Sequence, residues 1–260
     1  MSAHPTLASV IRSEWIKFRS VRSSIMGVAI TFVLTIGIGA LITASIRTHW
    51  SAHPAAHIGF DPVTTSLGGT LFAQFAVGVI GALFVTSEYS SGSIRATFAA
   101  TPRRVEVVLA KLVVLVGSLL VVSEVAVFVT FLMGQAIYAG VVPTASLSTP
   151  TVLRAVLFGG LYLTLLGIIG MALGWLLRQS AACISVFTSL ILVLPIVTFL
   201  LPSSWQNTIG RFEPSTLGQS MESVSPPAHA FSAGASLLVL ALYAAVLMAV
   251  AAAALTRRDA

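Results

Sequence analysis

Residues 112–138 have the sequence LVVLVGSLLVVSEVAVFVTFLMGQAIY, an apolar run in which Glu124 is the one charged residue. A helix needs about 20 mostly apolar residues to cross roughly 30 Å of hydrocarbon, and this run is longer than that. It therefore predicts a transmembrane helix that is long enough to tilt or to protrude from the bilayer.

Five further runs of this kind occur in the chain. They cover residues 25–46, 67–86, 153–177, 181–201 and 235–255. Only Arg178, Gln179 and Ser180 separate the run 153–177 from the run 181–201, which predicts a tight helical hairpin. We therefore expect an all-α polytopic membrane protein with six transmembrane helices.

The composition supports the same class. Of the 260 residues, 57% are hydrophobic and 8% are charged, whereas a soluble domain has about 25% charged residues to cover its surface. Lipid must therefore surround much of the chain. The one cysteine, Cys183, lies inside an apolar run, so an intramolecular disulfide and a cysteine-based zinc site are excluded, and we expect no metal site.

The basic residues indicate the orientation in the membrane. If the N-terminus marks one side, the basic residues on that side are Arg12, Lys17, Arg19, Arg22, Arg95, Arg103, Arg104, Lys111, Arg178, Arg257 and Arg258. Only Arg47, Arg154 and Arg211 lie on the other side. Basic loops stay in the cytoplasm, so we expect a multi-pass protein of the cell (inner or plasma) membrane with both termini cytoplasmic. The net charge of +6 follows from this topology and indicates no nucleic-acid partner.

Residues 1–24 predict a cytoplasmic amphipathic helix that lies in the interface, and residues 25–260 form the six-span domain. Apolar side chains recur on one face when the segment is wound as a helix, with most basic side chains outside that face. The residues singled out in this helix are Glu14, Trp15, Lys17, Phe18 and Arg19. Glu14 lies near the middle of the apolar face, where it either pairs locally with Lys17 or faces a protein partner.

Two hydrophilic segments are distinctive. The cytoplasmic segment 87–110 contains Gly92, which permits a break after the second span, and residues 94–100, which can form a short helix. Thr101 and Pro102 are a start signal for the next helix. A basic anchor on anionic lipid would explain the arginines but not this placement of glycine and proline. The external segment 202–234 is too long for a minimal turn and predicts an external cap or a re-entrant hairpin.

The chain resembles the membrane subunit of ABC exporters, the ABC type-2 permease family, and its actinobacterial members in particular. The resemblance lies in the opening Ser13-Glu14-Trp15-Ile16-Lys17-Phe18-Arg19, the glutamate-x-x-x-glycine of the cytoplasmic segment and its Thr-Pro-Arg-Arg turn, and it extends over the order of the six spans. It implies that the docking loop for a separate ATPase subunit contains Glu88, Gly92, Arg95, Pro102, Arg103 and Arg104.

The family assembles two permease subunits, identical or different, with two ATPase domains, and it exports hydrophobic drugs (multidrug or antibiotic export), peptides, lipids or polysaccharide.

The sequence has no P-loop for ATP. A P-loop needs a lysine after a glycine, and the only two lysines, Lys17 and Lys111, follow Ile16 and Ala110. We therefore expect no cofactor in this chain, with ATP and Mg on the partner ATPase, and no enzyme activity of its own. The alternatives are an integral-membrane enzyme or a non-transporting immunity or sensor protein.

Glu124 is the candidate for a translocation pathway, with Thr130 and Gln135 further along the same span. A carboxyl group near mid-bilayer is costly, so it is a functional candidate by default. It is either protonated and packed, or it faces a wet cavity.

Two features predict helix geometry. Gly170 and Gly174 form a GxxxG pattern on the fourth span, which indicates close helix packing. Pro195 predicts a bend in the fifth span, because proline lacks the N–H that the helix needs.

Overall fold

Six helices of the described residues are long and apolar enough to cross a membrane. The structure is a computed structural model that describes residues 6–52, 57–101 and 103–257, so Pro102 and Arg258 lie outside it. The spans are α2 (Arg22–Phe32) with η1 (Val33–Ile38) and α3 (Gly39–His49), α5 (Thr70–Ser90), α7 (Arg104–Tyr138), α8 (Pro150–Leu177), α9 (Ser180–Thr188) with η4 (Ser189–Val193) and α10 (Leu194–Phe199), and α13 (Ala233–Arg257). The predicted all-α, six-span fold is confirmed.

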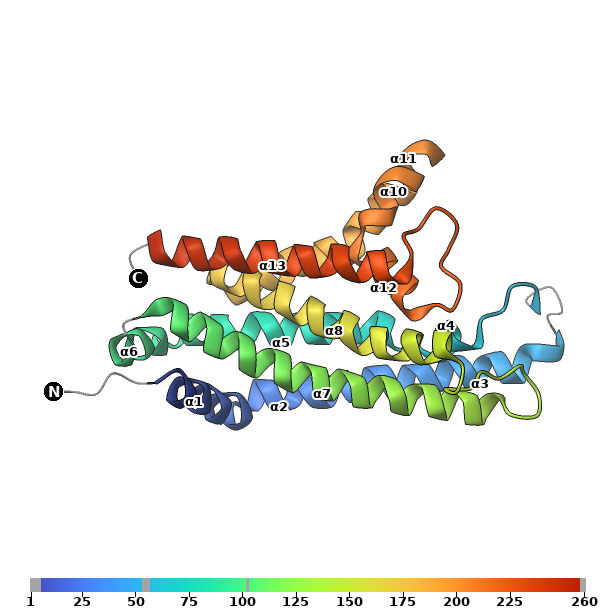
Figure 1. Cartoon of the computed structure of the whole chain (residues 1–260), viewed down its shortest axis with the longest axis horizontal. Helices are drawn as coiled ribbons and strands as arrows, with labels where there is room; N and C mark the ends of the chain where they lie inside the picture. Colours follow the sequence, from blue (N-terminus) through green and yellow to red (C-terminus); the bar gives the residue numbers. More distant parts are fainter. Residues whose placement is uncertain (1–5, 53–56, 102, 258–260) are drawn as a thin grey trace.

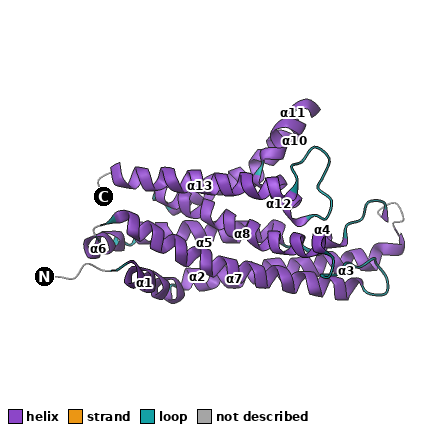
Figure 2. Ribbon diagram, in the orientation of Figure 1, coloured by secondary structure: helices purple, strands orange, loops and turns teal. Residues whose placement is uncertain are grey.

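Shorter helices connect or flank these spans. They are α1 (Leu7–Ser20), η2 (Trp50–Ala52), α4 (Pro62–Ser66), α6 (Ser93–Ala100), α11 (Ser203–Ile209), η5 (Gly210–Phe212) and α12 (Pro214–Glu222). Helix α1 and the last turn of α13 lie at the same end as α6, and α4 lies at the opposite end (Figure 1). These are called the α6 end and the α4 end below. The described part of the chain contains no strand (Figure 2).

Helix α8 lies at the centre of the bundle, where it contacts α5, α7 and α13. Glycines let α8 approach α5 closely. A Cβ atom on Gly170 would overlap the carbonyl of Gly78, and one on Gly174 would lie 3.0 Å from the carbonyl oxygen of Ala82. The GxxxG pattern of the fourth span therefore packs within the chain.

This packing gives opposite expectations for two glycines. Gly170→Ala places a methyl group against backbone that cannot move aside, so we expect a loss of about 1–3 kcal/mol in stability. Gly117, on α7, has open space beside it, so Gly117→Ala should be neutral or stabilising by up to about 1 kcal/mol through helix propensity. Thermal unfolding of the two variants in detergent measures the difference. Equal melting temperatures would contradict the close α5–α8 contact.

Pro195 bends the fifth span, as predicted. The π-helical segment η4 directly precedes the helix that contains Pro195, because a residue without an N–H leaves an earlier carbonyl without its usual partner. Beyond this point α10 and α11 point away from the bundle (Figure 1). The bend separates the outer half of the fifth span from the sixth.

The segment 202–234 folds back between the spans. Helix α12 packs on α8 and α13, and a Cβ atom on Gly218 would overlap the ring of Tyr162. Tyr162 lies twelve residues after Pro150, or about 18 Å along α8 at 1.5 Å per residue. Helix α12 therefore packs against two spans of the bundle.

The helices on either side of the segment 87–110 are longer than predicted. Helix α5 continues to Ser90 and α7 begins at Arg104, so the segment 87–110 shrinks to residues 91–103. Hydropathy ends a span at Glu88 and Lys111 because both residues are charged. In the structure these two charges are paired inside the bundle, which lets both helices continue through them.

Candidate functional site

Four charged side chains meet inside the α6 end of the bundle. Helix α1 contributes Glu14 and Lys17, α5 contributes Glu88, and α7 contributes Lys111. The Lys111 side chain has no exposed surface, and Glu14 is 1% exposed. We call these four residues the charge cluster. Its two ammonium groups balance its two carboxylates, so the cluster is neutral as a whole.

Lys111 is the centre of the charge cluster. Its Nζ atom donates to Glu14 Oε2 at 2.7 Å, to Glu88 Oε1 at 2.8 Å and to the carbonyl of Phe84 at 3.4 Å. An ammonium group has three donors, so all three are used. The Phe84 ring also lies 4.3 Å from Nζ, in range for a cation–π contact. The burial of this lysine is therefore fully compensated.

Lys17 extends the charge cluster to α6. Its Nζ atom lies 2.7 Å from Glu14 Oε1, 3.1 Å from Glu88 Oε1 and 3.1 Å from Thr97 Oγ1 on α6. The Thr97 hydroxyl in turn donates to Glu88 Oε2 at 3.3 Å. Partial burial would lower the pKa of Lys17, but hydrogen bonds to Glu14 and the charges of both carboxylates outweigh it and raise the pKa. Lys17 therefore keeps its proton and its bonds through the physiological range.

Glu14 combines the local pairing with a longer-range one. It bonds to Lys17 three residues away and to Lys111, which is 97 residues away in the same chain. Val10, Glu14 and Phe18 are the buried positions of α1, and this face packs on α7 and α2. Trp15 and Arg19 are exposed, where they are free to contact lipid headgroups.

Helix α6 has the form that the sequence predicted for residues 94–100. Gly92 precedes it with a φ of 74°, a left-handed conformation that favours glycine. Ile94 is buried and anchors the helix to the bundle, whereas Arg95 is exposed. Ile94 holds one face of α6 against the bundle, and Thr97 bonds that helix to the charge cluster. The face with Arg95 is exposed.

The arginines after α6 differ in their surroundings. The Arg103 side chain is 78% exposed and bonds to Glu106 at 3.0 Å. Arg104 is half-buried; it donates to the carbonyl of Leu255 at 3.1 Å and lies over the Phe98 ring. The docking loop implied by the resemblance therefore divides into exposed residues, Arg95 and Arg103, and residues held inside the fold, Glu88 and Arg104.

The three pathway candidates on α7 do not meet at one place. Thr130 donates to the carbonyl of Ala126 within its own helix. Gln135 donates to the Ser66 hydroxyl at 2.9 Å and accepts from the backbone N–H of Ala145 at 2.7 Å, so it ties α7 to α4 and to the following loop. Both side chains thus have their hydrogen bonds within the fold.

Glu124 lies against α8 at Gly160, where a Cβ atom would overlap its carboxyl group. Its Oε2 atom is buried and has no hydrogen-bond partner among the described residues. Glu124 therefore remains the one pathway candidate with unused bonding capacity.

The structure also reveals a buried carboxyl group that the sequence did not single out. Glu222, at the end of α12, accepts from Thr70 Oγ1 at 2.8 Å, and its other oxygen has no partner among the described residues. A Cβ atom on Gly159, the neighbour of Gly160 on α8, would lie 3.5 Å from that oxygen. Nothing in the linear pattern distinguishes Glu222 from a surface acid, because α12 packs against α8 and α13 only in the folded chain.

Residues 60–260 match the family DUF2705, described as a protein of unknown function. The chain belongs to this family. The DUF2705 match includes α4 to α13, and therefore Glu88 and Lys111, whereas Glu14 and Lys17 lie before it. No curated protein matches the chain.

Removal of the central lysine tests the charge cluster. Lys111→Met leaves Glu14 and Glu88 facing each other in a buried site, so we expect a loss of about 3–5 kcal/mol in stability. Lys17→Met should cost less, because the Lys17 side chain is 37% exposed and water can replace it. Chemical unfolding in detergent measures both, and Arg103→Met serves as an exposed control.

Addition of Glu14→Gln to Lys111→Met should recover part of the loss, since it removes one uncompensated charge. If Lys111→Met unfolds no more easily than Arg103→Met, the charge cluster is not a structural requirement.

Proposed function

We propose that this chain is the membrane-spanning permease subunit of an ATP-driven ABC exporter, coupled through α6 to a separate ATPase subunit. The observation that supports this most is the connection of α6 to the charge cluster. Through Thr97 and Lys17, a short exposed helix is bonded to α1, α5 and α7 at once. A protein that pushes on α6 would therefore displace two spans and the interfacial helix together.

The contacts of the charge cluster suit the transmission of a motion of α6 to the spans. Hydrogen bonds between charged groups are stronger in a low-dielectric interior than in water, and every Lys111 donor is used. Such a joint resists local bending, so motion of α6 passes to α5 and α7 as a whole. Arg95 and Arg103 would face the ATPase, whereas Glu88 and Arg104 would hold the loop in position.

The remaining parts of the proposal follow from the resemblance. The chain works as a pair, with an identical or a different permease subunit, and ATP and Mg bind to the partner ATPase. It lies in the cell membrane with the α6 end in the cytoplasm, which the excess of basic residues at that end supports. The buried, unpartnered oxygen of Glu124 supports a pathway that passes this carboxyl group.

Charge reversal at the exposed arginines tests the docking site. The tagged chain is co-expressed with an ABC ATPase sought among the genes next to its own, and we expect the two proteins to co-purify in equal amounts. Arg95→Glu with Arg103→Glu should reduce ATPase recovery by about tenfold, because reversing both charges removes the charge complementarity that we propose with the ATPase surface. Arg257→Glu, an exposed arginine at the same end, is the control. Unchanged recovery with the double variant would refute the docking assignment.

Cysteine labelling tests the orientation. Ala99 on α6 and Thr144 in the loop before α8 are exposed positions at opposite ends, and the native Cys183 is buried. In intact cells, a membrane-impermeant maleimide should label Thr144→Cys and leave Ala99→Cys unlabelled until the membrane is opened. Labelling of Ala99→Cys from outside would place α6 beyond the reach of any cytoplasmic ATPase and end the proposal.

A further inference from the structure

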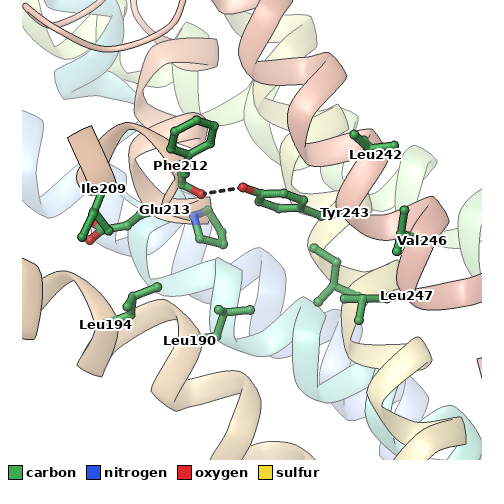
Figure 3. Close-up of a pocket in the computed structure, with 11 residues that line it drawn as sticks. Leu190, Leu194, Ile209, Phe212, Glu213, Leu242, Tyr243, Val246 and Leu247 are labelled. Atoms are coloured by element: carbon green, nitrogen blue, oxygen red, sulfur yellow. Dashed lines mark hydrogen bonds between the residues drawn. The ribbon is translucent and has the colours of Figure 1, made fainter. Parts of the chain in front are cut away.

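An apolar pocket of about 620 Å³ lies between the fifth and sixth spans (Figure 3). One wall consists of side chains such as Leu190 and Leu194, from the π-helical and bent part of the fifth span. The opposite wall is α13, with Leu242 and Val246. Nine of the eleven lining residues are apolar, and the other two are Glu213 and Tyr243. The pocket thus has a hydrocarbon lining with a single acidic group.

The pocket lies at the depth of the membrane core. Leu242 and Val246 are about 14 and 20 Å from the start of α13 at Ala233, at 1.5 Å per residue, and the end of the pocket nearer the α4 end is formed by Phe212, Glu213 and Pro214. Beyond the bend at Pro195, the fifth span diverges from the sixth (Figure 1). A ligand in this position would be surrounded by apolar side chains, so it must be lipophilic over most of its surface.

Glu213 is the anomaly in this lining. It is 5% exposed, and its Oε1 atom is buried with no hydrogen-bond partner among the described residues. Its Oε2 atom has only a 3.5 Å contact with the Thr216 hydroxyl, which is at the limit of a hydrogen bond. No ion pair to Glu213 occurs within the described ranges. A buried carboxylate left in this way is costly unless a cation approaches it.

The nearest arginine in sequence does not fill this role. The Arg211 guanidinium lies 5.1 Å from the Phe212 ring centre and 5.3 Å from that of Phe231, and these two rings hold it in a cation–π arrangement. Tyr243 donates its hydroxyl to the carbonyl of Phe212 at 3.3 Å, the bond drawn as a dashed line in Figure 3. Its ring lines the pocket, and an aromatic face attracts a cation.

We propose that this pocket binds a lipophilic monocation, with the apolar body between the fifth and sixth spans and the positive charge against Glu213. The charge complementarity selects this occupant over a neutral acyl chain, which would leave the carboxylate unpaired. The inference rests on the proposed function, for which it names the class of exported substrate. The site itself belongs to one chain and needs no ATPase to be filled.

Binding of radiolabelled tetraphenylphosphonium to the purified chain, in detergent and without the ATPase, tests this directly. The wild type should bind the cation saturably, and Glu213→Gln should weaken binding by about tenfold or more, which corresponds to about 1.4 kcal/mol. Glu106→Gln removes a carboxylate that lies outside the pocket, on α7 at the α6 end, and should bind as the wild type does.

A second pair of variants tests the cavity without a change of charge. Val246→Trp fills the pocket from an exposed position and should abolish binding. Leu238→Trp adds the same ring at another exposed position of α13, outside the lining, and should leave binding intact. Because both sites are exposed in the monomer, neither variant should prevent folding, which the elution profile checks.

Neutral triphenylphosphine oxide should fail to displace the labelled cation, whereas unlabelled tetraphenylphosphonium should displace it. Wild-type affinity in Glu213→Gln, or displacement by the neutral oxide, would overturn the proposal in favour of a lipid or other uncharged occupant. Disulfide cross-linking of Val246→Cys between two chains would overturn it in favour of a second copy. Failure here leaves ATPase co-purification unaffected, so the two proposals can fail separately.

Discussion

The α6 end of the bundle depends on Lys111, Glu14 and Glu88, which are buried together, with the partly exposed Lys17 beside them. An unpaired charge in a low-dielectric interior is strongly destabilising, so none of the three buried groups can be buried alone. Lys111 has no exposed surface and uses every donor; it therefore requires Glu14 from α1 and Glu88 from α5. Helix α1, two spans and α6 are thereby positioned by a single set of contacts.

Five of the eight acidic side chains form two groups at different positions along the bundle. Near α6, Glu14 and Glu88 are paired with lysines and hold elements together. Nearer the α4 end, Glu124, Glu213 and Glu222 are tucked against α8 or α12, and each has one buried oxygen without a partner among the described residues. The first group suits a rigid joint, and the second suits the recognition of a cation or a proton. The proposed coupling thus uses glutamates that are paired with lysines, and the proposed binding site uses a glutamate that has no cationic partner.

Close helix packing connects these two regions. Glycines on α5 and α8 remove the side chains between the two helices, so their backbones are in direct contact. Helix α8 in turn contacts α12 and α13, and these elements form much of the apolar pocket. Helix-to-helix contacts therefore extend from α5 through α8 to α12, the helix that Glu213 precedes.

The sequence by itself determined the features that rest on local composition. Six apolar runs, the hairpin at Arg178, the bend at Pro195 and the short helix after Gly92 follow from run length and from single residues with special backbone behaviour, and the structure has all of them. The tertiary structure alone decided which charges are paired, since Lys111 meets partners 23 and 97 residues away. It also decided that 202–234 would turn back between the spans and bury Glu213 and Glu222. Burial and pairing are properties of neighbours in space, and hydropathy along one chain records only neighbours in sequence.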